Sequence, residues 1–325
     1  MEKIVDVVIP VYRPDKKLYK LLDKLADQSV KPDKVIIMNT ETGRAEDSSE
    51  NLAAEVENFF ARKVTLKKGE LLNITIKPVM KSEFDHGGTR DAAFMSSGAP
   101  YVLFLTQDAV PSDPYLIEEM LQMFMAEDVG VVYGRQLANR SSGIVEGYTR
   151  LYNYPSVSAV HSKADIKKLG VKAFYCSDVC AMYRRDVYIA NGGFVKKTIF
   201  NEDMIFAGNY ILKGGKVGYC ADAKVYHSHK YTCKAQFKRN FDLGVSQADH
   251  PEVFKSVSST GEGLKYVWKI TRYLGDQHYF YLMPGFYAQC LARYLGYKLG
   301  TVYKSLPKSL VLLFTSNKNY WDGVL

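Results

Sequence analysis

Carboxylates that could do chemistry stand at two points of the sequence. Asp108 closes the run Thr106-Gln107-Asp108 directly after an apolar stretch, and Glu202 and Asp203 are adjacent in Asn201-Glu202-Asp203-Met204. A carboxylate after a strand can hold a divalent cation that neutralises a diphosphate, or it can cap a nearby helix. The acidic pair could serve as a general base for a hydroxyl, or simply suit the dipole at a helix start.

Two histidines, His227 and His229, are separated by one residue after an apolar run. On a strand this spacing puts both on one face, where they could meet a metal ion or a phosphate; the alternative is a structural pair. A zinc site that also uses Cys176 and Cys180 is disfavoured, because the spacing is loose and no second close pair exists. The five cysteines are odd in number and scattered, which favours a reducing compartment.

The stretch 85–91 combines glycines with charge as Asp85-His86-Gly87-Gly88-Thr89-Arg90-Asp91. Glycines before a helix allow backbone N–H groups to approach an anion, and Arg90 adds a fork for phosphate. The alternative is a glycine turn before a capped helix. A Gly-x-Gly-x-x-Gly fingerprint and a Gly-Lys-Ser/Thr loop are both missing from the sequence, which argues against a nicotinamide-dependent dehydrogenase and a P-loop kinase.

The elements that must position these residues alternate in type along the first third of the chain. Short β-branched or apolar runs predict strands, and apolar residues at helical spacing predict helices between them. The predicted strands are 5–10, 35–38, 72–79 and 101–105, and the predicted helices are 18–25, 44–62 and 90–96. This order predicts βαβ units and a mostly parallel sheet, with ligands at the carboxyl ends of its strands.

The pattern changes after residue 110. We expect a helix over 115–125, a strand over 130–134, mixed strands and turns over 174–225, and helices from about 236 onward. Residues 236–325 carry 11 Lys/Arg and 6 Asp/Glu, a surplus of five out of a net charge of +8. Such a surface should attract nucleotide diphosphates, lipid headgroups or nucleic acid.

The first residues lack the apolar core of a signal peptide, and the charge-free stretch 277–292 is shorter than a spanning helix needs. We therefore expect a protein that is soluble or bound to a membrane surface, with a cytoplasmic location that includes the inner face of the cell membrane.

Taken together and in order, these blocks resemble the GT-A glycosyltransferases of family 2, and within them the bacterial rhamnosyltransferases. The resemblance covers about residues 3–245. It is carried by five stretches: Val7–Tyr12, His86–Ala93, Leu105–Pro111, Asn201–Asp203 and His227–His229. It implies an α/β GT-A fold with a C-terminal helical extension. We expect a catalytic domain over 1–235, with a nucleotide-sugar half at 1–110 and an acceptor half at 111–235, followed by a basic, aromatic-rich extension at 236–325.

The resemblance also implies roles for single residues. Asp203 would be the catalytic base, with Glu202 as the alternative, and Asp108 and His229 would hold Mn²⁺ or Mg²⁺. The donor site would be formed by Pro10, Val11, Tyr12, Glu41, Arg90, Gln107 and Asp108. Asp178 and Tyr183 would lie on the acceptor side, where a tyrosine ring can stack on a sugar; an ordinary strand with a polar edge is the alternative there.

The implied reaction is inverting transfer of L-rhamnose from dTDP-β-L-rhamnose to an undecaprenyl-diphosphate-linked saccharide in cell-surface polysaccharide synthesis. Thr106 stands where the family's metal motif has an aspartate, which leaves fewer carboxylates for a metal. The alternatives are a family 2 enzyme with another donor, such as UDP-galactofuranose or a UDP-hexose, and a catalytically inactive sugar-binding module. For the extension, peripheral membrane contact, a homodimer interface and packing on the catalytic domain remain open, and nucleic acid is not expected as a partner.

Overall fold

The computed structural model describes residues 4–64, 72–126, 128–255, 257, 260–322 and 324. In the first third of the chain, strands and helices alternate as the sequence predicts. The strands are β1 (Val5–Tyr12), β2 (Lys34–Glu41), β3 (Ile74–Met80) and β4 (Tyr101–Leu105), and the helices are α1 (Lys16–Ala26), α2 (Ser49–Val64) and α3 (His86–Met95). All neighbours in the order β3-β2-β1-β4 pair in parallel, so the predicted βαβ arrangement is confirmed.

The second part of the sheet mixes directions. Its strands are β5 (Val110–Pro111), β6 (Val131–Leu137), β7 (Ala159–His161), β8 (Cys180–Arg184) and β9 (Val217–Tyr226). Strand β8 lies antiparallel between β4 and β6, while β6 and β9 are parallel to each other. As a result the carboxyl ends of β4, β6 and β9 and the amino end of β8 meet at one edge of the sheet.

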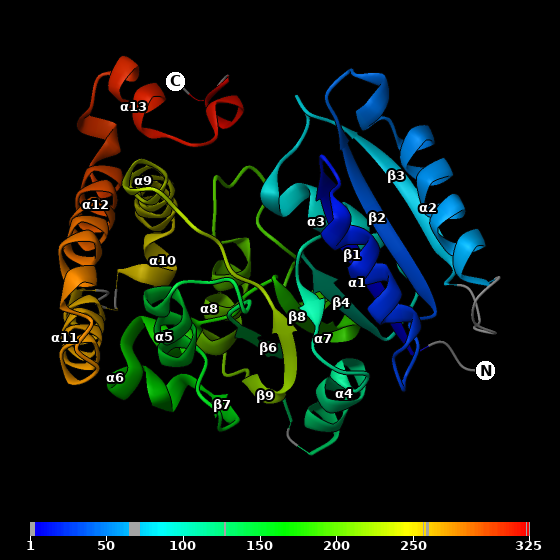
Figure 1. Ribbon diagram of the computed structural model, residues 1–325, viewed down its shortest axis with the longest axis horizontal. Helices are drawn as coiled ribbons and strands as arrows, with labels where there is room; N and C mark the ends of the chain where they lie inside the picture. The colour runs from blue at the N-terminus through cyan, green and yellow to red at the C-terminus, as the bar shows by residue number, and fades with distance from the viewer. Residues whose placement is uncertain are drawn as a thin grey trace.

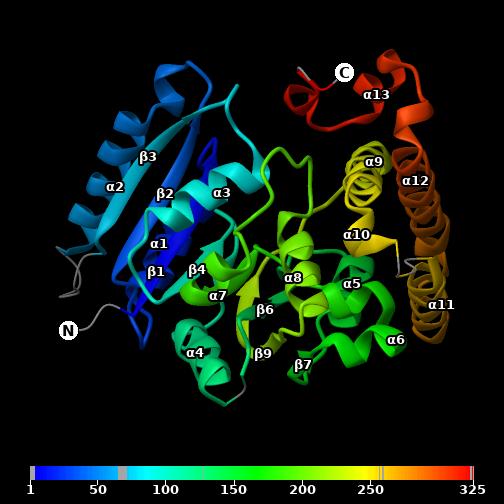
Figure 2. The same cartoon turned by 180° about the vertical axis from the view of Figure 1, so that it is seen from behind.

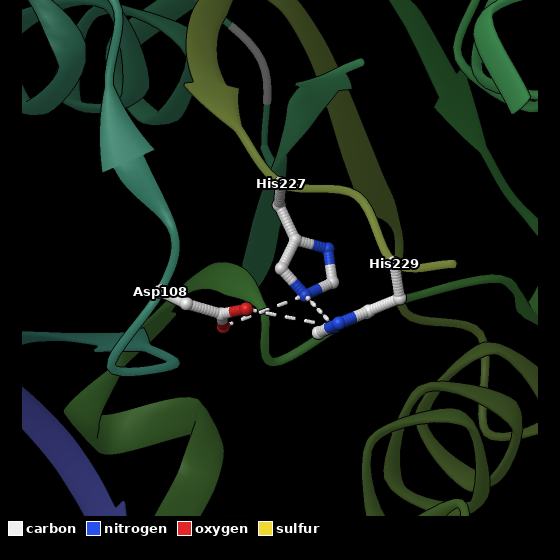
Figure 3. A group of neighbouring side chains, drawn as sticks. All are labelled: Asp108, His227 and His229. Carbon is white, nitrogen blue, oxygen red and sulfur yellow. Dashed lines mark hydrogen bonds and ion pairs between the residues drawn. The ribbon is translucent and has the colours of Figure 1, made fainter. Parts of the chain in front are cut away.

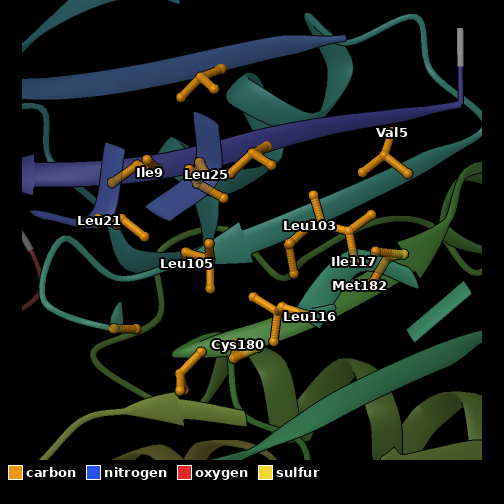
Figure 4. Close-up of a cluster of buried hydrophobic side chains, with 14 of the residues drawn as sticks. Val5, Ile9, Leu21, Leu25, Leu103, Leu105, Leu116, Ile117, Cys180 and Met182 are labelled. Atoms are coloured by element: carbon orange, nitrogen blue, oxygen red, sulfur yellow. The ribbon is translucent and has the colours of Figure 1, made fainter. Parts of the chain in front are cut away.

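Helices cover both faces of the sheet, as Figures 1 and 2 show from opposite sides. One buried cluster joins α1, α2 and α4 (Leu116–Ala126) to the first face, and Figure 4 shows part of it around Leu21, Leu25, Leu103 and Leu105. The second face packs on α3, α7 (Arg185–Ala190) and α8 (Glu202–Leu212). The remaining helices of this part are α5 (Ile144–Asn153) and α6 (Ile166–Leu169).

Helix α1 illustrates how the sequence produces these elements. Its four fully buried residues, Leu18, Leu21, Leu22 and Leu25, repeat at intervals of three and four and form one apolar stripe. The side chain of Asp15 accepts a hydrogen bond from the backbone N–H of Lys17 and so caps the first turn.

The C-terminal part is helical, as expected, and contains α9 (Cys233–Asp249), α10 (Pro251–Phe254), α11 (Thr260–Asp276), α12 (Met283–Thr301) and α13 (Lys308–Phe314). Short 3₁₀ turns complete the chain at Ala45–Asp47, Lys163–Asp165, Gly170–Phe174, Phe280–Leu282, Tyr303–Ser305 and Lys318–Trp321. Figure 1 shows α9, α11 and α12 at the side of the molecule away from β3. Among the described residues, no helix is both long and apolar enough to cross a membrane.

Glycines bring α9 and α12 into close contact. A Cβ added to Gly300 would lie 2.1 Å from the carbonyl oxygen of Phe241, and one added to Gly296 would lie 2.2 Å from that of Phe237. Ile199, which precedes α8, and Phe241 of α9 belong to one buried cluster, so α9 packs on the part of the chain that carries the sheet. The helical extension at 236–325 therefore packs on the rest of the chain, one of the three alternatives considered for it. The proposed domain boundary at 235/236 falls just inside α9 and stays a prediction.

Candidate active site

A cavity of about 540 Å³ opens at the sheet edge where β4, β6, β8 and β9 meet. A second cavity of about 430 Å³ lies beside it, next to the carboxyl end of β1. Arg90, Thr106, Asp108 and His229 line both. The larger cavity is also walled by residues of the C-terminal helices α9 and α12, namely Gln236, Arg239, Asn240, Leu243 and Arg293.

Asp108, His227 and His229 converge between the two cavities (Figure 3). The carboxylate of Asp108 lies 3.6 Å from Nε2 of His227 and 3.5 Å from Nε2 of His229. The two Nε2 atoms are 2.9 Å apart. One carboxylate oxygen and two imidazole nitrogens that all point to one place form a group that could hold a divalent metal ion.

The side chain of Gln136 orients His227. Nδ1 of His227 lies 3.0 Å from Oε1 of Gln136, and the same oxygen accepts a hydrogen bond from Nη1 of Arg150 at 2.5 Å. The Nδ1 position therefore carries the proton, which leaves the lone pair on Nε2 for a metal. Burial lowers the pKa of His227 to about 3, although Asp108 opposes this, so the ring is neutral at neutral pH.

Lys17 adds a positive charge at the same place. Its ammonium lies 3.5 Å from Oδ2 of Asp108, and it lines the smaller cavity. Burial would raise the pKa of Asp108, but the neighbouring His227, His229 and Lys17 hold it below its usual value. Thr106, which stands where the family has an aspartate, donates a hydrogen bond to Asp108 at 3.1 Å and so takes part in orienting it.

Arg90 is enclosed by acidic groups. Its Nη1 lies 3.0 Å from Glu202 and its Nε lies 3.5 Å from Asp178, with all three side chains almost fully buried. Although burial opposes it, Arg90 holds the pKa of Glu202 below its usual value. Glu202 is thus an ionised partner of Arg90, which makes it a poor candidate for the base.

Asp203 is the part of this cluster that remains partly open to the larger cavity. Its Oδ2 accepts a hydrogen bond from the backbone N–H of Asp178 at 3.0 Å, and its Oδ1 accepts one from the N–H of Met204 at 2.7 Å. Burial and the charge of Glu202 raise the pKa of Asp203 to about 7. A fixed carboxyl group that titrates near neutral pH is suited to accept a proton from a hydroxyl.

The backbone at Asn201 sets up the acidic pair. Asn201 precedes α8 in the left-handed region, with φ of 67°, which non-glycine residues seldom adopt. In the described part of the chain the buried Nδ2 of Asn201 has no hydrogen-bond partner, and the residue lines the larger cavity. Such a conformation is typical of functional sites, and here it starts the helix so that Glu202 and Asp203 diverge toward different neighbours.

The predicted donor residues gather only in part. Six of the seven line the smaller cavity, namely Pro10, Val11, Tyr12, Arg90, Gln107 and Asp108. Gln107 holds the backbone of Tyr12, because its Oε1 accepts from the N–H and its Nε2 donates to the carbonyl oxygen, at 2.8 and 3.2 Å. Glu41 lies outside both cavities and its carboxylate accepts from the N–H of Ser49 at 2.8 Å, at the start of α2.

The structure contradicts the idea that Tyr183 stacks on a sugar. Its side chain is fully buried among aromatic residues of the second core, and its hydroxyl donates to Asp178 at 2.7 Å. Asp178 does line the larger cavity, and its place on the acceptor side stays a prediction. A strand residue looks the same in the sequence whether it faces the core or a cavity, which explains the error.

The glycines at 87 and 88 also serve a structural purpose. The carboxylate of Asp85 caps α3 by accepting from the N–H of Gly88, and it accepts from the N–H groups of Lys197 and Thr198 as well. A Cβ on Gly87 would lie 1.8 Å from the carbonyl oxygen of Val195. The capped-helix alternative is therefore correct, and the helix start is not free for an anion.

The cysteine-based zinc site is excluded. Cys176 and Cys180 lie in the two different core clusters, on opposite faces of the sheet. Both are free thiols.

Several site residues were not predicted individually. Lys17, Gln136, Arg150, Arg239 and Arg293 all line one of the two cavities. Lys17 lies in the first turn of α1, next to the predicted donor segment, and that position is the one signal that could have found it. The others come from distant parts of the chain.

The family follows from comparison with known proteins. Residues 6–192 match the model of the family described as "Glycosyl transferase family 2". The chain is 35% identical over 322 residues to the O-antigen chain rhamnosyltransferase RfbN of Salmonella typhimurium, covering 98% of this chain and 96% of that protein.

The chain belongs to glycosyltransferase family 2.

A second relative of this family 2 chain is the O-antigen chain rhamnosyltransferase WbaN of Salmonella anatum, 40% identical over 253 residues, which is 77% of this chain and 79% of that protein. Among solved structures, the mannosyltransferase PcManGT of Pyrobaculum calidifontis, in complex with GDP-Man and Mn²⁺, superposes with a TM-score of 0.60 at 12% identity, covering 94% of this chain and 89% of the other. S. aureus TarS 1–349 in complex with UDP-GlcNAc gives 0.51 at 11% identity, covering 93% and 91%. These similarities show the GT-A fold that the sequence predicts.

Proposed function

We propose that this family 2 glycosyltransferase transfers L-rhamnose from dTDP-β-L-rhamnose to an undecaprenyl-diphosphate-linked saccharide during O-antigen or related surface polysaccharide synthesis. The observation that carries the proposal is identity of 35% and 40% to two O-antigen chain rhamnosyltransferases over most of the chain. The arrangement of the site supports it, because Asp203 and the Asp108–His227–His229 group line one cavity.

Asp203 is the proposed base. As the acceptor hydroxyl attacks the anomeric carbon from the side opposite the diphosphate, a carboxylate oxygen of Asp203 takes its proton. The two backbone N–H groups that bind this carboxylate keep it in place during the transfer. A single displacement inverts the configuration and needs no covalent enzyme intermediate.

Asp108, His227 and His229 would hold the divalent cation, which when bound neutralises the diphosphate of the donor. One carboxylate and two neutral imidazoles suit Mn²⁺ better than Mg²⁺, which prefers oxygen ligands. Lys17 would contribute a further positive charge on the donor side. Pro10, Val11 and Tyr12, held by Gln107, would form the wall against the nucleoside.

The test is release of nucleoside diphosphate from dTDP-rhamnose, UDP-glucose, UDP-GlcNAc and UDP-galactofuranose, with Mn²⁺, Mg²⁺ or EDTA and a saccharide acceptor. Acceptor-dependent release from dTDP-rhamnose is the expected result. Release from a UDP-sugar instead would overturn the donor while keeping the base. Donor binding without release from any of them would favour the inactive sugar-binding module. Homodimer formation and contact with the inner face of the membrane stay predictions.

A further inference from the structure

A third cavity, of about 520 Å³, lies between α9, α11 and α12. Its volume is in the range of ordinary ligand pockets, which is roughly 300–1,000 Å³. Apolar side chains dominate its lining, with Leu264, Val267, Leu291 and Tyr294 among them. The composition differs from the other two cavities, whose walls carry the carboxylates, histidines and arginines of the site.

This apolar cavity adjoins the larger cavity of the active site. Asn240, Leu243 and Arg293 line both, so the two cavities share a wall formed by α9 and α12. Both figures of the whole chain place these helices side by side (Figures 1 and 2). Apolar surroundings therefore begin at Arg293, at the border of the cavity that Asp203 lines.

Arg293 lies where the two cavities adjoin, and its guanidinium has a hydrogen-bond donor available for a ligand. Its Nη1 donates to the hydroxyl of Tyr266 at 3.2 Å, and its buried Nε has no hydrogen-bond partner among the residues that the structure describes. Within the described part of the chain, its guanidinium forms no ion pair with a carboxylate and instead lies 5.6 Å from the ring centre of Tyr266. An arginine with unused donors between a polar and an apolar cavity is suited to a phosphate group on a lipid.

From these observations we infer that the cavity between α9, α11 and α12 binds the first isoprene units of the lipid-linked acceptor, and that Arg293 binds its diphosphate. The inference deepens the proposed function and rests on it for the identity of the acceptor. The larger cavity contains the base Asp203 and polar side chains, Arg293 lies at its border, and the apolar cavity lies on the other side of Arg293. That order matches a saccharide joined through diphosphate to an isoprenoid chain.

The surface around the apolar cavity agrees with this occupant. Leu264 and Leu291 line it and are nevertheless 68% and 57% exposed. Lys298 lines it too, so a cation stands near the apolar walls. An isoprenoid chain would cover the exposed side chains of Leu264 and Leu291. Lys298 would attract the anionic headgroups of the membrane lipids around that chain.

The first test compares two acceptors that carry the same saccharide, one on undecaprenyl diphosphate in detergent and one on a methyl aglycone. In the double variant Leu264→Gln/Leu291→Gln, the ratio of kcat/KM for the lipid acceptor to that for the soluble acceptor should fall about tenfold or more. Because both side chains are exposed, the fold should be unaffected. Leu295→Gln is the matched control, since Leu295 is 45% exposed on the same helix and lies outside the cavity. An unchanged ratio in the double variant would overturn the inference.

The second test does not depend on the donor. Calorimetry with farnesyl diphosphate should detect binding to the full-length protein, weakened about tenfold or more by Arg293→Gln and by the double variant. Binding of farnesyl diphosphate without turnover of any sugar nucleotide would leave the lipid site standing and remove the proposed function. Rhamnosyl transfer without binding of farnesyl diphosphate would overturn the lipid site and leave the proposed function in place.

Discussion

Oε1 of Gln136 accepts hydrogen bonds from both Nδ1 of His227 and the guanidinium of Arg150. The two hydrogen bonds fix which end of the amide is oxygen, and that in turn fixes the proton on Nδ1. The nitrogen of His227 that would bind a metal ion is thus set by a residue on a neighbouring strand.

Replacing Gln136 with leucine should weaken Mn²⁺ binding by about 10- to 100-fold, because His227 loses the acceptor that orients it. Titration calorimetry with MnCl₂ measures this directly. The exposed Gln122→Leu on α4 is the control and should bind Mn²⁺ like the unmodified protein. Equal affinity in both variants would show that Gln136 does not act through the histidine.

Asp203→Asn should lower kcat by about 10²- to 10⁴-fold while the Kd for the donor stays nearly the same, because the amide cannot take the proton. Single-turnover kinetics and donor calorimetry separate the two effects. Glu202→Gln should behave differently. It leaves Arg90 without its closest partner and should cost about 3–5 kcal/mol of stability, visible as a lower Tm. Retained turnover in Asp203→Asn would remove the base assignment.

The pKa of about 7 for Asp203 predicts the pH dependence of activity. The base is active when ionised, so log(kcat/KM) should rise with unit slope below about pH 7 and level off above it. A profile that is flat between pH 5.5 and 8 would contradict this.

The raised pKa of Asp203 also affects stability, which should fall as the pH rises, whereas activity should rise. A carboxyl group whose pKa is raised on folding binds a proton in the native state that the unfolded chain has lost between about pH 4 and 7. Its contribution to stability therefore falls as the pH rises through that window. Asp203→Asn should remove this dependence of stability on pH. At pH 8 it should raise the free energy of unfolding, measured by chemical denaturation, by about 1 kcal/mol or more.

Lys17→Met should weaken donor binding and leave the protein folded, because Lys17 is half-exposed and its ammonium faces Asp108 beside the donor cavity. We expect a rise of about tenfold in the Kd for the sugar nucleotide, with a smaller effect at high salt. Lys20→Met, on the exposed side of the same helix, is the control. A donor affinity that does not change in Lys17→Met would place the diphosphate elsewhere.

Two glycines of α12 should respond oppositely to alanine. Gly300→Ala introduces a Cβ 2.1 Å from the Phe241 carbonyl and should destabilise by about 1–3 kcal/mol or more, since the helices must separate. Gly285→Ala meets no atom within 4 Å and should stabilise by about 0.5–1 kcal/mol. Chemical denaturation of both variants measures the difference, and a similar sign in both would contradict the glycine contact between α9 and α12.

The first half of the fold was predictable because its parallel strands are buried on both faces and read as continuous apolar runs. In the second half the helix at 115–125 and the strand at 130–134 are confirmed as α4 and β6. The pairing of its strands was not predictable, because β8 pairs antiparallel with β4 across a separation of about 80 residues that no local pattern records. Asp108 could be singled out because it follows a recognisable strand, and Asp203 because it belongs to an acidic pair at a helix start. Their proximity to one cavity had to come from the structure.

Gln136 could not be predicted, since it meets His227 across 91 positions of sequence and a glutamine in a strand carries no distinctive signal. Arg90 shows a different difficulty. The sequence suggested a phosphate contact, whereas burial places its charge against Glu202 and Asp178. An arginine at the correct place can neutralise the protein's own carboxylates as readily as those of a ligand.

The catalytic cavity draws its walls from two parts of the chain, and this has an evolutionary consequence. Asp108 lies within the segment 6–192 that the family shares, whereas Arg239 and Arg293 belong to α9 and α12, beyond it. Substitutions in the α9 wall would change the space that this cavity offers to an acceptor saccharide, while Asp108, His227 and His229 stay as they are.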